Sequence, residues 1–291
     1  MRKIRANRLY ICLASLAVFG NGAFAAEFIS SDGVELISLG LALILTVATL
    51  YFSLKAAAFF KNKTNSAKSR LVLPIIFTAA AILCILAAVY SLENLIKICA
   101  NTVAKEMSTG LIILSLVLTV VAIVASKQKV LLKFSVLLLP LCLALILFIF
   151  LMSFPYMSIK YLEIKSLPEM NLLITATAKR FLLGFLPVCL PIAVLCLDKP
   201  LSAVAGGAIG SGLVIITAVN TILIFGSQFA SELSYPYAEA VSAVSVGELF
   251  SRMDAALYPI CFFPGVVRIA VQLTAAIKLL KKAKKIRKLS I

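Results

Sequence analysis

Residues 224–268 read IFGSQFASELSYPYAEAVSAVSVGELFSRMDAALYPICFFPGVVR, a polar passage set between two apolar segments. Small apolar residues recur at every third position in the passage. This spacing predicts an amphipathic helix over 228–252 that lies on a membrane surface. The second apolar segment carries Arg268, about 21 Å along a helix that starts near Asp254. A charge at membrane depth is rare and costly, so Arg268 is a candidate functional residue.

The composition of the chain is that of a helical membrane protein. Of its 291 residues, 62% are hydrophobic and 14% are charged, and the mean hydropathy of +1.09 is too high for a soluble domain of this length. The chain has no histidine, no paired carboxylate in an apolar segment and no nucleophile motif. We therefore expect neither an enzyme nor a cofactor or metal site. The seven cysteines form no CxxC pair and are typical of packing residues.

Charged residues divide the sequence into eight apolar segments of membrane-spanning length. Most of the 28 Lys and Arg residues fall at the N-terminus, in alternate connections and in the tail 278–291, which predicts that both termini are cytoplasmic. The predicted spans are about 9–26, 34–54, 71–92, 107–126, 131–153, 181–197, 203–227 and 255–277.

The first segment also resembles a cleavable signal peptide, because it has a basic start, an apolar middle and an Ala-Phe-Ala ending. Cleavage would leave seven spans and retention gives eight, and the charge distribution is compatible with both. We expect retention, because the first segment forms a pair with the sixth.

Both members of this pair are short and interrupted. The first contains the step Gly20-Asn21-Gly22, and the sixth contains Gly184 and Pro187, residues that weaken or break a helix. Backbone groups freed inside a membrane need protein or water partners, so two breaks in matching positions predict a ligand site near the midplane. The alternative is that Gly and Pro are simply common in membrane helices.

Three further stretches have expected roles outside the ligand site itself. The connection formed by residues 154–180 is long and balanced in charge, which predicts an external cap over the site. The seventh segment holds small residues around Gly206 and Gly210, which predict a helix-packing face. The basic tail 278–291 is expected to bind anionic lipid headgroups, and nucleic acid is not an expected partner.

Residues 180–280 resemble the spore germination permease family, the B subunits of germinant receptors in endospore-forming bacteria; the first half of the chain matches more loosely. The family shows a Lys-Pro step after the sixth span and a Tyr/Phe-Pro passage after the seventh. A Gly-(Asp/Glu)-Phe-x-x-Arg-(Leu/Ile/Met)-(Asp/Glu) pattern follows. The matching residues here are Lys199-Pro200, Phe225-Gly226 through Ala230 with Tyr235-Pro236, and Gly247-Glu248-Leu249-Phe250 with Arg252-Met253-Asp254.

This resemblance implies a fold similar to the leucine transporter, in the amino acid–polyamine–organocation (APC) superfamily, whose first and sixth spans unwind around the ligand. It also implies a small amino acid ligand, an inner cell or spore membrane, and partners in a germinant receptor A subunit and a lipoprotein C subunit. The chain departs from the pattern because the last two helices of the fold are missing. It also has no acidic residue within an apolar core, which counts against proton-coupled transport.

The predicted ligand-binding residues lie at the two breaks and near the start of the eighth span. They are Gly20, Asn21, Gly22, Gly184, Phe185, Pro187, Cys261 and Phe262. The resemblance implies that Arg268 takes the place of a sodium ion and ties the eighth span to the first. The alternative is an arginine that reaches headgroups or caps backbone carbonyls. Glu248, Arg252 and Asp254 are predicted to serve partner contacts or gating, although Asp254 also suits a plain helix cap.

The sequence thus predicts a subunit that binds a small amino acid at the membrane midplane and signals germination together with its partners. Two alternatives stay open. One is an amino-acid permease of the same superfamily, and the other is a structural subunit that no longer binds ligand.

Overall fold

The computed structural model describes residues 2–20, 35–62, 67–103, 108–126, 128–162, 170–233, 235–244 and 254–288. Within these ranges the chain forms helices and the turns between them, without a β-strand. The elements are α1 (Arg2–Phe19), α2 (Glu35–Asn62), α3 (Ala67–Ile98), η2 (Cys99–Val103), α4 (Thr109–Ala125), α5 (Gln128–Ser153), η3 (Phe154–Tyr156), η4 (Ile159–Leu162), α6 (Met170–Lys179), η5 (Arg180–Phe185), α7 (Leu186–Leu195), α8 (Pro200–Phe225), α9 (Ser227–Glu232), α10 (Pro236–Ala243) and α11 (Asp254–Lys288).

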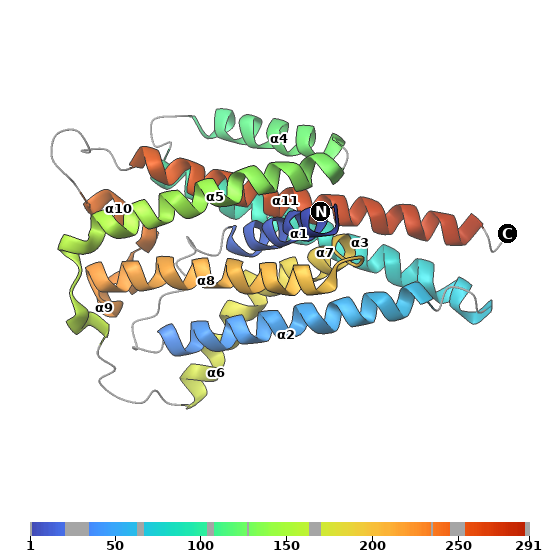
Figure 1. Cartoon of the computed structure of the whole chain (residues 1–291), viewed down its shortest axis with the longest axis horizontal. Coiled ribbons are helices and arrows are strands. Elements are labelled where there is room, and N and C mark those ends of the chain that lie inside the picture. The colour runs from blue at the N-terminus through green and yellow to red at the C-terminus, as the bar shows by residue number, and fades with distance from the viewer. Residues whose placement is uncertain are drawn as a thin grey trace.

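The long helices run roughly along one another and form a bundle (Figure 1). Five helices of the described chain are long and apolar enough to cross a membrane, and a bent pair formed by α6 and α7 makes a sixth if it counts as one span. The first and fourth predicted segments are shorter apolar helices, Asn7–Phe19 and Thr109–Ala125. The described part of the chain is therefore all-α, with five or six helices of membrane-spanning length where the sequence predicts eight.

Helix α1 lies inside the bundle and packs on α8, α5 and α11 (Figure 1). It ends at Phe19, where the predicted interruption begins, so its apolar part is about 20 Å long at ~1.5 Å per residue. A Cβ on Gly206 of α8 would lie 2.4 Å from the Ile11 carbonyl oxygen, and a Cβ on Gly210 would lie 2.4 Å from that of Ser15. The predicted packing face on the seventh segment is thus confirmed, because only glycine lets the two backbones approach so closely.

The sixth segment starts earlier than predicted. Met170–Leu182 and Leu186–Leu195 form a pair of helices bent by 41°, with the π-helical turn η5 at the bend. The predicted start at residue 181 relied on the charge of Arg180, but this side chain is 1% exposed and donates a hydrogen bond to Ser38 Oγ of α2. The last part of the predicted cap 154–180 therefore belongs to the broken segment, because tertiary contacts bury a charge that was expected in water.

The passage 228–252 does not form the single amphipathic helix that was predicted. Its described part forms two short helices, α9 and α10, because the chain is extended at Leu233 and is non-helical at Tyr235, which precedes a proline. Helix α10 buries most of its side chains and packs on α8 and α11, so it covers the bundle. Residues 245–253 lie outside the described ranges.

Helix α11 positions the candidate site. It packs along α3 and also contacts α1, α4, α5 and α7, so every side of its middle part meets another helix. Two prolines, Pro259 and Pro264, lie inside it. Its final part carries the basic tail, which is helical to Lys288.

Candidate functional site

A buried guanidinium joins four elements in the middle of the bundle. Arg268 of α11 is 1% exposed, and its Nη1 and Nη2 donate to the carbonyl oxygens of Gly20 and Gly184, each at 2.7 Å. Its Nε donates to Ser91 Oγ of α3 at 3.2 Å. The side chain thus ties α11 to the end of α1, to η5 and to α3. It caps carbonyls, as one sequence alternative holds, and does not reach headgroups.

Gln272, one turn further along α11, extends these contacts. Its Nε2 donates to Ser91 Oγ at 3.1 Å and to the Pro187 carbonyl oxygen at 3.4 Å. Pro191 lies four residues after Pro187 and has no N–H for that carbonyl, so the Gln272 amide replaces the missing donor. Gln272 Oε1 is buried and has no hydrogen-bond partner in the described chain. We call Gly20, Ser91, Gly184, Arg268 and Gln272 the arginine joint.

The backbone around the joint favours a cation. The Gly20 N–H bonds to the Leu16 carbonyl oxygen at 2.9 Å, so Gly20 closes α1, and its own carbonyl lies at the helix end that carries partial negative charge. Gly184 lies in a π-helical turn, where the regular hydrogen-bond ladder is interrupted. The hydrogen-bond partners of Arg268 among the described residues are all neutral. Backbone dipoles therefore offset the charge of Arg268, and none of these hydrogen-bond partners is a carboxylate.

Sterics explain why glycine stands at the end of α1. A Cβ on Gly20 would lie 2.4 Å from the Pro264 carbonyl oxygen and 3.1 Å from the Gly265 nitrogen, both in α11. Real Cβ atoms do not approach backbone so closely, so a side chain here would push α1 away from α11. The Gly20 carbonyl then reaches Arg268, one turn beyond Pro264 on the same helix.

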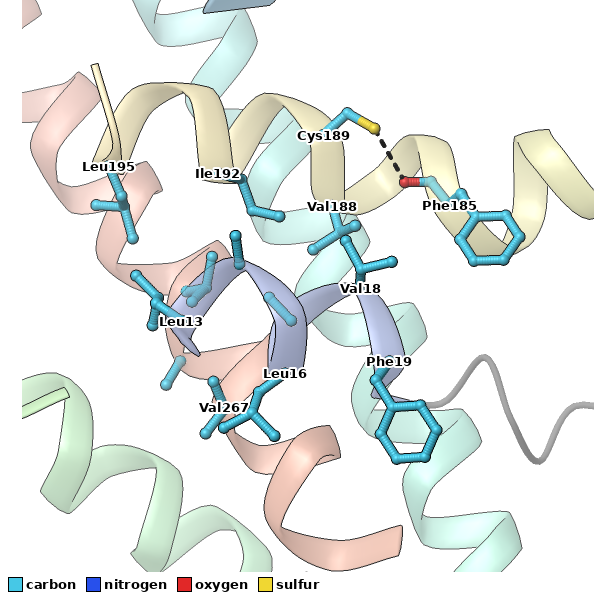
Figure 2. Packing of buried hydrophobic residues seen from close by; sticks show 14 of the residues in the cluster. Leu13, Leu16, Val18, Phe19, Phe185, Val188, Cys189, Ile192, Leu195 and Val267 are labelled. Carbon is cyan, nitrogen blue, oxygen red and sulfur yellow. Dashed lines mark hydrogen bonds between the residues drawn. The ribbon is translucent and has the colours of Figure 1, made fainter. Parts of the chain in front are cut away.

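Apolar side chains surround the broken ends. In Figure 2, Val18 of α1 and Val188 of α7 point toward one another, and Phe19 and Phe185 stand where the two broken helices end. Both phenylalanines are fully buried. Cys189 Sγ lies 3.4 Å from the Phe185 carbonyl oxygen, as the dashed line in Figure 2 marks. Such dry surroundings strengthen the hydrogen bonds of the joint.

The structure brings some predicted ligand-binding residues together and separates others. Those that meet at the break are Gly20, Gly184, Phe185 and Pro187. Phe262 packs instead in a second apolar cluster with residues of α3 and α4, and its ring meets that of Phe263 edge-on at 5.7 Å. Cys261 is 1% exposed within the main apolar core. The ligand role of Cys261 and Phe262 stays a prediction.

Four predicted residues, Asn21, Gly22, Glu248 and Arg252, lie outside the described residues. Asp254 is the first residue of α11. The partner and gating roles of Glu248, Arg252 and Asp254 stay predictions.

Ser91 and Gln272 are site residues that the sequence analysis misses. Gln272 had a usable signal, because it lies four residues after Arg268 and shares its helix face. Ser91 had none, since its place depends on how α3 packs against α11. In the described part of the chain, no group of three His, Cys, Asp or Glu side chains could hold a metal ion. The arginine joint consists of hydrogen-bond donors and acceptors, which are the groups that bind polar ligands.

Comparison with known proteins assigns no family. No protein-family model matches the chain, and no curated protein is significantly similar to it.

Proposed function

We propose that the protein is a B-type subunit of a spore germinant receptor, which binds a small amino acid at the broken helices and signals germination with partner subunits. The observation that carries the proposal is the bridge from Arg268 to the carbonyl oxygens of both interrupted segments, at Gly20 and Gly184. A ligand that inserts between these segments must rearrange this bridge, so binding and conformation are linked at one side chain.

The joint has the groups that a zwitterionic amino acid needs. A guanidinium has five N–H donors and pairs well with a carboxylate, and Arg268 uses three donors in its described hydrogen bonds. Gln272 Oε1 is a buried acceptor without a donor, which suits an ammonium group. An unsatisfied buried acceptor costs about 1–3 kcal/mol, so a donor from the ligand would be favourable.

A fixed cation favours a sensor over a cation-coupled pump. Unwound carbonyls and half-helix C-terminal ends are where transporters with broken helices bind a mobile cation. Here the guanidinium of Arg268 occupies such carbonyls and cannot leave. Ligand binding would therefore shift the population between two arrangements of α1, η5 and α11, without ion transport.

The proposal includes a leucine-transporter-like fold of the APC superfamily, in the inner cell or spore membrane with both termini cytoplasmic. The sequence resemblance over 180–280 supports this part, together with the bent pair of α6 and α7 and the end of α1 at Phe19. The expected partners are a germinant receptor A subunit and a lipoprotein C subunit.

Binding and uptake measured together test the proposal. The full chain is reconstituted in liposomes, alone and with the A and C subunits, and is screened against the twenty labelled amino acids. Saturable binding without uptake, lost in Arg268→Met, is the expected result. Concentrative uptake would identify a permease and overturn the proposal. Absence of both binding and uptake in every preparation would overturn it in favour of a structural subunit.

A further inference from the structure

An apolar groove runs along the outside of the broken segment. It has a volume of about 460 Å³ and lies between α2, α3 and the bend from η5 to α7. Cys84 and Cys189, each 1% exposed, form its floor. Leu83 and Leu86, each 60% exposed, and Leu182, 53% exposed, form its rim. Leu83 and Leu86 belong to a helix of membrane-spanning length and Leu182 to the bent pair, so the groove opens sideways toward lipid.

The groove touches the bend itself. Leu182 and Leu186 flank the 41° bend, and both line the groove. Pro187 lines it as well, while the Pro187 carbonyl oxygen accepts the hydrogen bond from Gln272 on the side of the arginine joint. A molecule in the groove would therefore pack against the bend from the side opposite to Gln272.

The lining selects an apolar chain as the occupant. Its polar side chains are those of Ser53 and Tyr90, and it has no charged one, so a zwitterion would lose its hydration there without compensation.

Charge at one end of the groove indicates the headgroup. Ser53 lies two residues, about 3 Å along the helix axis, before Lys55, which is exposed. The Lys55 Nζ lies 4.8 Å from the centroid of the Tyr51 ring, which holds the cation beside the helix. The sequence over 55–70 is basic and has no acidic residue. Its cations are Lys55, Lys61, Lys63, Lys68 and Arg70.

We propose that this groove binds an acyl chain of an anionic phospholipid, with the headgroup beside Lys55, and that the bound chain holds the bend between η5 and α7. The site is separate from the amino-acid site proposed above, and does not depend on it.

The absence of tryptophan from the chain permits a direct test. Single tryptophans are placed at Leu86 or Leu83 on the rim, and at Ile82, which is 52% exposed on the same helix and does not line the groove. Each full-length variant is reconstituted in phosphatidylcholine liposomes with a small fraction of phosphatidylglycerol that carries brominated acyl chains. We expect strong, saturable quenching at Leu86→Trp and Leu83→Trp at fractions that barely quench Ile82→Trp.

Two further variants test the acyl-chain site and the headgroup site independently. Ala87→Phe fills the groove and should reduce quenching at residue 86 to the level of the Ile82→Trp control. Lys55→Gln should lower the preference for phosphatidylglycerol over brominated phosphatidylcholine about fivefold, the equivalent of ~1 kcal/mol for one basic residue at a membrane surface. Equal quenching at residues 82, 83 and 86, or equal quenching by the two lipids in the parent chain, would overturn the proposal.

Discussion

The Arg268 guanidinium donates to the Gly20 carbonyl oxygen at 2.7 Å, across 248 residues of sequence. One contact thereby closes the broken end of the first apolar helix with a side chain from the last. Because Gly184 accepts from the same guanidinium, the two interrupted segments share one cation. Changes at this point should affect ligand response more strongly than membrane insertion.

Replacement of the cation is the first prediction. Arg268→Met removes the donors to two buried carbonyls, each worth about 1–3 kcal/mol, but also removes a buried charge whose desolvation is costly. We therefore expect amino-acid binding to be lost, while the melting temperature in detergent falls only modestly. Arg268→Lys should not restore binding, because a single ammonium cannot reproduce the planar fork. Lys281→Met, exposed on the same helix, is the matched control; wild-type binding by Arg268→Met would contradict the role of the cation.

Gly20 should tolerate no side chain. In Gly20→Ala the new Cβ meets the Pro264 carbonyl oxygen at 2.4 Å, which separates α1 from α11 and lengthens the contact with Arg268. Overpacking of this kind costs about 1–3 kcal/mol, and we expect lower thermal stability together with weaker ligand binding. Gly40→Ala is the control, since a Cβ there has no neighbour within 4 Å. Equal melting temperatures for the two variants would refute the close approach.

The packing of α1 on α8 makes a similar pair of substitutions informative. Gly210→Ala places a Cβ 2.4 Å from the Ser15 carbonyl oxygen and 2.9 Å from Val18 Cβ, whereas Gly212→Ala meets open space. We expect the first variant to lose about 1–3 kcal/mol. The second should be neutral or gain up to ~1 kcal/mol from helix propensity. Unfolding monitored in detergent measures both, and the reverse order would contradict the arrangement of α1.

The free acceptor of Gln272 gives the fourth prediction. Gln272→Met keeps the size of the side chain but removes both the Nε2 donor and the unpartnered Oε1. If Oε1 receives the ligand ammonium, binding should weaken about tenfold or more, equivalent to ~1.4 kcal/mol. Stability should change less, because removal of the unsatisfied oxygen offsets part of the lost hydrogen bonds. An unchanged dissociation constant with a large loss of stability would assign Gln272 a purely structural role.

Several features follow from local pattern. The apolar character of the long helices, the end of α1 close to the Gly20-Asn21-Gly22 step and the small-residue face on α8 depend on residue type and spacing. Arg268 could be selected as exceptional because a charge in an apolar run is visible without any tertiary contact. The boundary at Arg180 could not be predicted correctly, because burial of a charge depends on neighbouring helices. The break at Tyr235-Pro236 was a local signal that the three-residue periodicity outweighed in the prediction of a single helix over 228–252.

Composition and periodicity alone thus predict an all-α chain of membrane type with a cation, Arg268, inside an apolar segment. Tertiary structure alone decides which groups that cation meets. Four elements distant in sequence supply these groups and their neighbour: the carbonyls of Gly20 and Gly184, the hydroxyl of Ser91 and the nearby amide of Gln272. Their meeting depends on backbone approaches of a few ångströms, as at Gly20 and Pro264, and such distances arise from the packing of whole helices.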